Sequence, residues 1–152
     1  MIVKKCTDFD NMFGRTIIYP YLCTIKITNT MAYISTEKVK EMRNKLKELF
    51  PAKKGWKISV TTQNYSSVNC SILTAPFELR LDTNRTNESV NHYYVKEHYN
   101  DNPASRDALL SMLEVLNMNN YNNSDAQSDY FDVGHYVNLS IGKWDKPFLV
   151  KK

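Results

Sequence analysis

The chain has 152 residues, the length of one domain, and with 42% hydrophobic and 24% charged residues its composition excludes an intrinsically disordered protein. No apolar run approaches the roughly 18 residues that a membrane-spanning helix needs, and the opening MIVKKCTDFD lacks the apolar stretch of a secretion signal. We therefore expect a cytoplasmic protein without a membrane partner.

The net charge of +4 is distributed unevenly along the chain. Residues 1–60 contain 12 Lys or Arg against 5 Asp or Glu, whereas residues 61–152 contain 8 against 11. A basic surface binds nucleic acid or an acidic protein face, and an acidic surface can bind the basic channel of a nucleic-acid enzyme. The alternative is a well-mixed folded surface, because segments distant in sequence can be neighbours in space.

The first 30 residues are predicted to form an N-terminal extension to an α+β domain that spans residues 31–152. Within residues 1–30, Tyr21–Thr28 alternates apolar and polar side chains as a β-strand does. Pro20 interrupts the apolar residues before this segment, so those residues are expected to form an edge strand or a loop.

A helix is predicted over about Thr36–Phe50. Ser35 is a suitable N-cap, and Pro51 ends the element. Apolar residues three or four apart form one stripe that should face a core. The stripe consists of Val39, Met42, Leu46, Leu49 and Phe50.

A β-hairpin should follow, because Trp56–Thr61 and Val68–Leu73 both alternate in polarity. The connection Gln63–Ser67 is longer than a two-residue hairpin turn. Trp56 shares a face with the apolar residues of its strand and is expected in the core. Residues 77–81 predict another short strand.

The second half of the domain is expected to begin with a loop, residues 82–102, around a short Tyr93–Val95 element. A second helix should run from Pro103 to about Asn117, since Pro is favoured at the first helical position. The asparagine-rich run after it is expected to be an exposed loop, and Tyr136–Ile141 alternates as a strand. Together these elements predict a single α+β domain in which two helices pack on one face of an antiparallel sheet.

One succession of motifs carries a resemblance to a known family. In chain order it contains Arg43, Leu46-Lys47, Phe50-Pro51, Lys57-Ile58-Ser59-Val60, Tyr65-Ser66 and Pro76. With these motifs, Tyr33–Glu78 resembles the large polyvalent protein-associated domains of phages, plasmids and integrative elements. The stretch Ser128–Phe148 is similar to the ends of small accessory proteins that carry this domain. The resemblance implies a mobile element acting in a bacterial cell, where small proteins often counter host defences, including as anti-CRISPR inhibitors.

Catalytic and metal-binding motifs are missing from the sequence. His92 and His98 match no metal-ligand spacing, and we expect both, with His135, to be surface or aromatic-cluster residues. The three cysteines lack a C-x-x-C spacing and fit reduced thiols, of which Cys23 and Cys70 should be buried on strands. No P-loop, G-x-G-x-x-G or G-x-S-x-G occurs. We therefore expect no enzyme, no cofactor and no metal.

Two groups of charged residues are candidate binding residues. The basic group combines a helix flank with the helix-to-strand corner and consists of Lys40, Arg43, Lys47, Lys53, Lys54 and Lys57. Such a cluster can neutralise phosphates, although lysines on an amphipathic helix also serve solubility. The acidic group is Asp125, Asp129 and Asp132, whose spacing matches no calcium loop, so a solvated acidic patch is favoured over a metal site.

The expected function is binding of a host macromolecule by a small non-enzymatic protein, most concretely inhibition of a Cas nuclease. Such an inhibitor could occupy a nucleic-acid channel with its acidic residues, or clamp a nuclease domain and block the rearrangement that licenses cleavage. The alternative is a basic nucleic-acid-binding module. A protein partner is favoured, because the acidic balance after residue 60 would repel a duplex that extends beyond the basic group.

Overall fold

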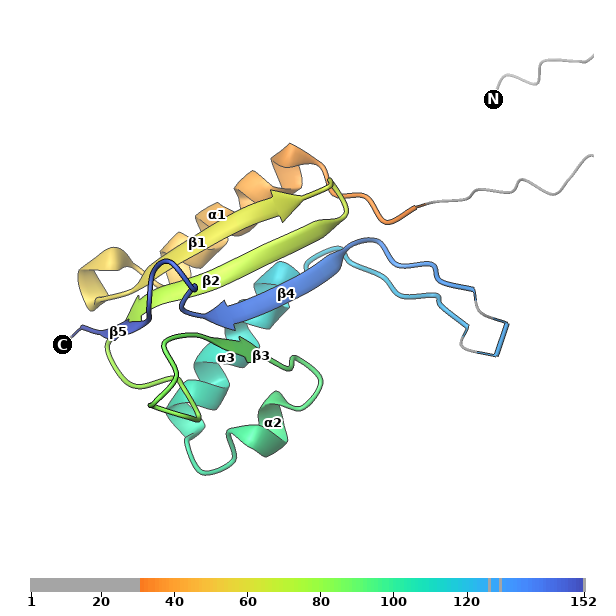
Figure 1. Cartoon of the computed structure of the whole chain (residues 1–152). Helices are drawn as coiled ribbons and strands as arrows, with labels where there is room; N and C mark the ends of the chain where they lie inside the picture. Colours follow the sequence, from red (N-terminus) through yellow and green to blue (C-terminus); the bar gives the residue numbers. More distant parts are fainter. Residues whose placement is uncertain (1–30, 126, 129, 152) are drawn as a thin grey trace, which may run out of the picture.

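The computed structural model describes residues 31–125, 127–128 and 130–151 (Figure 1). The predicted N-terminal extension with its strand, and Asp129, lie outside the described residues. The elements are α1 (Thr36–Leu49), the 3₁₀ helix η1 (Ala52–Lys54), β1 (Lys57–Gln63), β2 (Ser67–Ala75), β3 (Glu88–Val90), α2 (Val95–His98), α3 (Pro103–Leu116), β4 (Tyr136–Ile141) and β5 (Leu149–Val150). Among these, no helix combines the length and apolarity that a bilayer crossing requires.

Both long helices begin at the predicted capping residues. The Ser35 hydroxyl accepts a hydrogen bond from the Lys38 N–H at 3.3 Å, and the Asn102 side chain accepts one from the Ser105 N–H at 3.2 Å. Each cap satisfies a donor that the first helical turn leaves free, which is worth about 1 kcal/mol. The predicted helices are confirmed, with α1 ending one residue before Phe50. The predicted core stripe of α1 is wrong at Leu49, which is exposed in the last turn, whereas Val39, Met42 and Leu46 are buried.

The sheet has the strand order β1-β2-β4-β3, and β5 pairs with the end of β2 beyond β4. The predicted hairpin is confirmed as the antiparallel β1–β2 pair, and β3–β4 is also antiparallel. The single α+β domain with a mostly antiparallel sheet is therefore confirmed. The central β2–β4 pair is parallel, a feature that the prediction did not include. A parallel neighbour requires a long crossover, which here contains α3.

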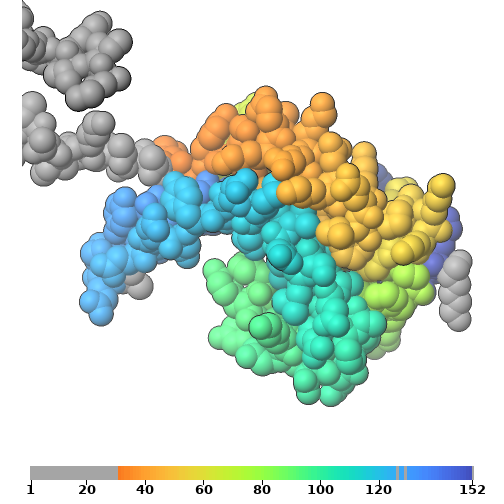
Figure 2. Space-filling model, turned by 180° about the vertical axis from the view of Figure 1, so that it is seen from behind, coloured from red at the N-terminus to blue at the C-terminus, as the bar shows by residue number. Residues whose placement is uncertain are grey.

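Alternation along the strands gives the sheet one apolar and one polar face. The apolar face contains Val68, Cys70, Ile72, Val137, Leu139 and Ile141, all buried. Figure 1 shows α1 and α3 behind this face, and Figure 2, from behind, shows them side by side, as predicted. On the polar face, the Asn138 amide donates to Asn69 at 2.8 Å, and the Asn69 amide donates to Gln63 at 3.2 Å.

The region after β2 differs from the prediction. Residues 77–81 form no strand, because the Glu78 carboxylate folds the chain locally: it accepts bonds from the Arg80 guanidinium and from the backbone N–H of Leu79 and Arg80. The strand that pairs with β4 on its other side is β3, in the segment predicted as loop. Of the expected Tyr93–Val95 element, Tyr93 and Tyr94 form the turn before α2, and Val95 is the first residue of α2. Three-residue strands such as β3 are too short to leave a periodic pattern.

The contact between Glu78 and Arg80 should contribute to the acid dependence of stability. The hydrogen bond from the Arg80 side chain, above all, lowers the pKa of Glu78. Because the pKa of Glu78 is lower in the folded protein than in the unfolded chain, this stabilisation is complete at pH values above the pKa of Glu in the unfolded chain, about 4.3. It is lost as the pH falls through the pKa of Glu78 in the folded protein. In denaturant titrations at stepped pH, Arg80→Gln should reduce the stability lost on acidification, whereas Arg85→Gln, in an exposed ion pair, should not. Equal acid dependence in wild type and Arg80→Gln would contradict this.

The thiol of Cys70 should be unreactive in the folded protein. It is 1% exposed on β2, and burial raises its pKa to about 12. In a variant with Cys6 and Cys23 changed to Ser, an aromatic disulfide reagent at about pH 8 should modify Cys70 only after unfolding, because the thiolate is the reacting species. Modification of the folded protein as fast as of the denatured control would show that β2 is accessible.

Candidate functional site

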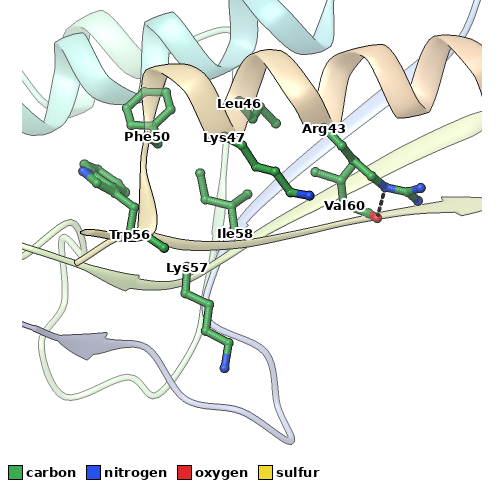
Figure 3. A pocket seen from close by; sticks show the side chains of 9 residues that line it. Arg43, Leu46, Lys47, Phe50, Trp56, Lys57, Ile58 and Val60 are labelled. Atoms are coloured by element: carbon green, nitrogen blue, oxygen red, sulfur yellow. Dashed lines mark hydrogen bonds between the residues drawn. The ribbon is translucent and has the colours of Figure 1, made fainter. Parts of the chain in front are cut away.

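A groove of about 370 Å³ lies between α1 and the outer edge of β1 (Figure 3). Among the described strands, β1 pairs only with β2, so its other edge borders the groove. The apolar side chains of Leu46, Phe50, Trp56, Ile58 and Val60 form the floor. Three cations, Arg43, Lys47 and Lys57, line the rim.

The turn between α1 and β1 places Trp56 in this floor. Pro51 follows the helix cap, η1 reverses the chain, and Gly55 ends the turn at a φ of +87°. A Cβ atom at Gly55 would lie 2.7 Å from the carbonyl oxygen of Lys151, so both the conformation and the space require glycine. Trp56 then packs edge-on against Phe50 at 4.8 Å and Phe77 at 5.7 Å between ring centroids.

The floor joins the core at its inner side and is open at its outer side. Trp56 and Leu46 are buried, with 7% and 2% of their surface exposed, which confirms the prediction that Trp56 is in the core. Phe50, Ile58 and Val60 are only partly buried against that core. An occupant of the groove would cover this apolar surface and gain about 25 cal/mol for each Å² removed from water.

The rim cations come from both elements. Arg43 donates from Nε to the carbonyl oxygen of Val60 at 3.0 Å, which holds its guanidinium at the mouth of the groove. Figure 3 shows Lys47 extending from α1 over Ile58, and Lys57 directed away from the helix. The lining of the groove therefore includes three of the six predicted basic residues; the side chains of Arg43 and Lys47 lie on the α1 side, and that of Lys57 points away from α1.

The other three basic residues extend the positive surface. Lys40 is exposed one helical turn before Arg43, and Lys53 and Lys54 are exposed on η1. Within the described part of the chain, none of the six forms an ion pair with an acidic side chain. The described carboxylates therefore form no ion pair with the cations that line the groove or extend its positive surface.

The predicted acidic residues lie apart from the groove. Asp125 and Asp132 are in the arm, residues 120–134, whose described part Figure 1 shows projecting from the body. The Asp125 carboxylate accepts bonds from the Gln127 N–H and the Ser128 hydroxyl, and these bonds lower its pKa. Asp132 accepts a bond from Asn123 at 3.3 Å. Over the described residues, no three His, Cys, Asp or Glu side chains are grouped to hold a metal ion.

The histidines give no catalytic pair. His92 and His98 contact the rings of Tyr93 and Tyr94, as expected for aromatic-cluster residues. The prediction for His135 is wrong: it is 2% exposed, and its Nε2 lies 2.9 Å from the carbonyl oxygen of Leu116, because the arm returns it to the end of α3. His92 and His135 line a second hollow of about 370 Å³ whose other lining residues are Asn, Tyr and Val, with no carboxylate or thiol.

The sequence predicts the cations of the groove as binding residues, but it does not predict that the apolar residues of the floor form part of a binding site. The sequence pattern places Phe50 in the helix stripe, and Ile58 and Val60 on the buried face of a hairpin. Alternation identifies the face of a strand but does not say whether that strand lies at the edge of the sheet.

No protein-family model, no curated protein and no solved structure matches this chain.

Proposed function

We propose that this protein is a non-enzymatic binding protein that takes an acidic segment of a partner protein into the groove between α1 and β1. The observation that carries the proposal is a partly exposed apolar floor beside three cations that have no acidic partner among the described residues. An apolar centre with a charged rim is typical of protein interfaces, in which Trp and Arg side chains contribute most. A nucleic-acid surface would instead place its cations along a phosphate path.

In its most concrete form, the partner is a nuclease of a bacterial host such as a Cas protein, and binding blocks the rearrangement that precedes cleavage. The resemblance to mobile-element proteins supports this form. The motifs that carry the resemblance include seven of the nine residues that line the groove: Arg43, Leu46, Lys47, Phe50, Lys57, Ile58 and Val60.

Reversing the rim charge should abolish capture of the partner. Immobilised wild-type protein should retain a protein from a nuclease-treated host lysate, and Arg43→Glu with Lys47→Glu should lose it. Losing a charge-assisted contact at the rim should cost about 2 kcal/mol or more of binding free energy, which corresponds to at least about thirtyfold weaker binding of the partner. The matched control is Lys38→Glu with Lys96→Glu, which makes the same charge change at exposed positions outside the groove lining and should keep the partner.

The nucleic-acid alternative makes the opposite prediction for the same variants. The proposal would be overturned if the protein bound naked DNA or RNA with sub-micromolar affinity and this affinity fell steeply with salt. In that case, only the Arg43 and Lys47 double variant would lose nucleic-acid binding. Equal capture of the protein partner by both double variants would place its binding surface elsewhere.

A further inference from the structure

Along the groove, the outer edge of β1 presents backbone groups that pair with no strand of residues 31–125, 127–128 and 130–151. The bond from Arg43 to the Val60 carbonyl oxygen shows that this carbonyl points away from β2. Backbone groups in an antiparallel strand point to alternate sides, residue by residue. The N–H and C=O groups of Ile58 and Thr62 therefore point to the same outer side as those of Val60, and no described strand pairs with them.

The groove supplies side-chain contacts to match that edge. Figure 3 shows Ile58 and Val60 directed toward α1, above the backbone of β1. A strand paired with the outer edge of β1 would direct every second side chain to the face of the sheet on which Ile58 and Val60 lie, because side chains alternate between the two faces of a sheet. Those side chains would cover the open part of the floor next to Phe50 and pass Lys47 on the rim.

Charge decides which strand fits. If two copies of this chain joined at their β1 edges, their rims of Arg43, Lys47 and Lys57 would meet, and like charges across paired strands are destabilising. Basic side chains on an edge are also a known protection against unwanted pairing. These cations form no ion pair with the described carboxylates, which favours a strand that carries acidic side chains and comes from another protein.

We propose that the acidic segment binds as an added β-strand on the outer edge of β1, with alternate apolar side chains on the groove floor. This inference rests on the proposed function and specifies its binding mode, in which main-chain bonds give affinity and the groove selects side chains. In the free protein, the Arg43 guanidinium donates a hydrogen bond to the Val60 carbonyl oxygen and so prevents another strand from pairing at this point of the edge. In the complex, a backbone N–H of the partner segment donates a hydrogen bond to this carbonyl oxygen, and the Arg43 guanidinium forms an ion pair with a carboxylate of the segment.

The test uses synthetic peptides of about nine residues, within the usual length of a strand. The first alternates Val and Glu. The second is identical but N-methylated at the alternate backbone amides that face β1 when the Val side chains lie on the groove floor, and the third replaces Glu by Lys. NMR titration of the full chain should show the Val-Glu peptide shifting the Trp56 indole signal. Hydrogen exchange at the N–H groups of Ile58, Val60 and Thr62 should slow at least about tenfold, because each becomes bonded.

The chain contains its own control for this measurement. The N–H groups of Ser59 and Thr61 point toward β2 and should keep their exchange rates. The Lys peptide should not bind, and the N-methylated peptide whose blocked amides face β1 should bind more than tenfold more weakly.

Three results would overturn the added strand, and they differ in whether the proposed function survives. Equal binding of the N-methylated peptide, or a Trp56 shift without slower exchange at Val60, would mean that the segment occupies the groove as a helix or a loop, and the proposed function would survive. No Trp56 shift at about 1 mM Val-Glu peptide would reject strand addition, and the lysate capture would then decide the proposed function separately.

Discussion

Leu46→Asp is expected to unfold the domain. Leu46 lies at the centre of the α1 stripe and is 2% exposed, and it belongs both to the groove floor and to the core. A buried carboxylate without a partner costs several kcal/mol, which is comparable to the roughly 5–15 kcal/mol that stabilise a whole domain. Circular dichroism on heating should show no cooperative transition for this variant.

The control for Leu46→Asp is Asn44→Asp, which introduces the same side chain at an exposed position of the same helix. It should change the free energy of unfolding by only about 0.5 kcal/mol. A soluble Leu46→Asp protein that melts cooperatively at the wild-type temperature would show that α1 does not pack through this stripe.

Trp56→Ala is expected to lower the free energy of unfolding by about 3–5 kcal/mol. The indole packs between the rings of Phe50 and Phe77, so its removal leaves a cavity at the junction of α1, β1 and the segment after β2. Trp56→Phe keeps an aromatic ring in this position and should recover part of the loss. Urea denaturation followed by circular dichroism measures all three proteins on one scale.

The second tryptophan provides the matched control. Trp144 is 88% exposed, against 7% for Trp56, so Trp144→Ala should change the free energy of unfolding by less than about 0.5 kcal/mol. A loss at Trp144 equal to that at Trp56 would contradict the assignment of Trp56 to the core side of the groove.

The sequence by itself determined the elements whose signals are local. The N-caps Ser35 and Asn102 lie three residues before the N–H groups that they bind, and Pro51 ends α1 within two residues of its last turn. Alternation located the β1–β2 hairpin, and β4 was placed at Tyr136–Ile141 with the correct bounds, because burial on one face repeats every second residue. The basic residues of the rim were found for the same reason, since they are close together in the chain.

Only the tertiary structure decided the order of the strands, and the candidate site depends on that order. β4 enters between β2 and β3, which leaves β1 at the edge of the sheet formed by the described strands and leaves Ile58 and Val60 partly uncovered. His135 is buried against Leu116, and the acidic arm is separated from the basic rim, through contacts between residues far apart in sequence. Local periodicity reports which side of an element is buried and contains no information about which element covers it. The order of the strands in the sheet and the packing of the helices on it settle that question, so a groove at the edge of the sheet becomes visible only in the assembled fold.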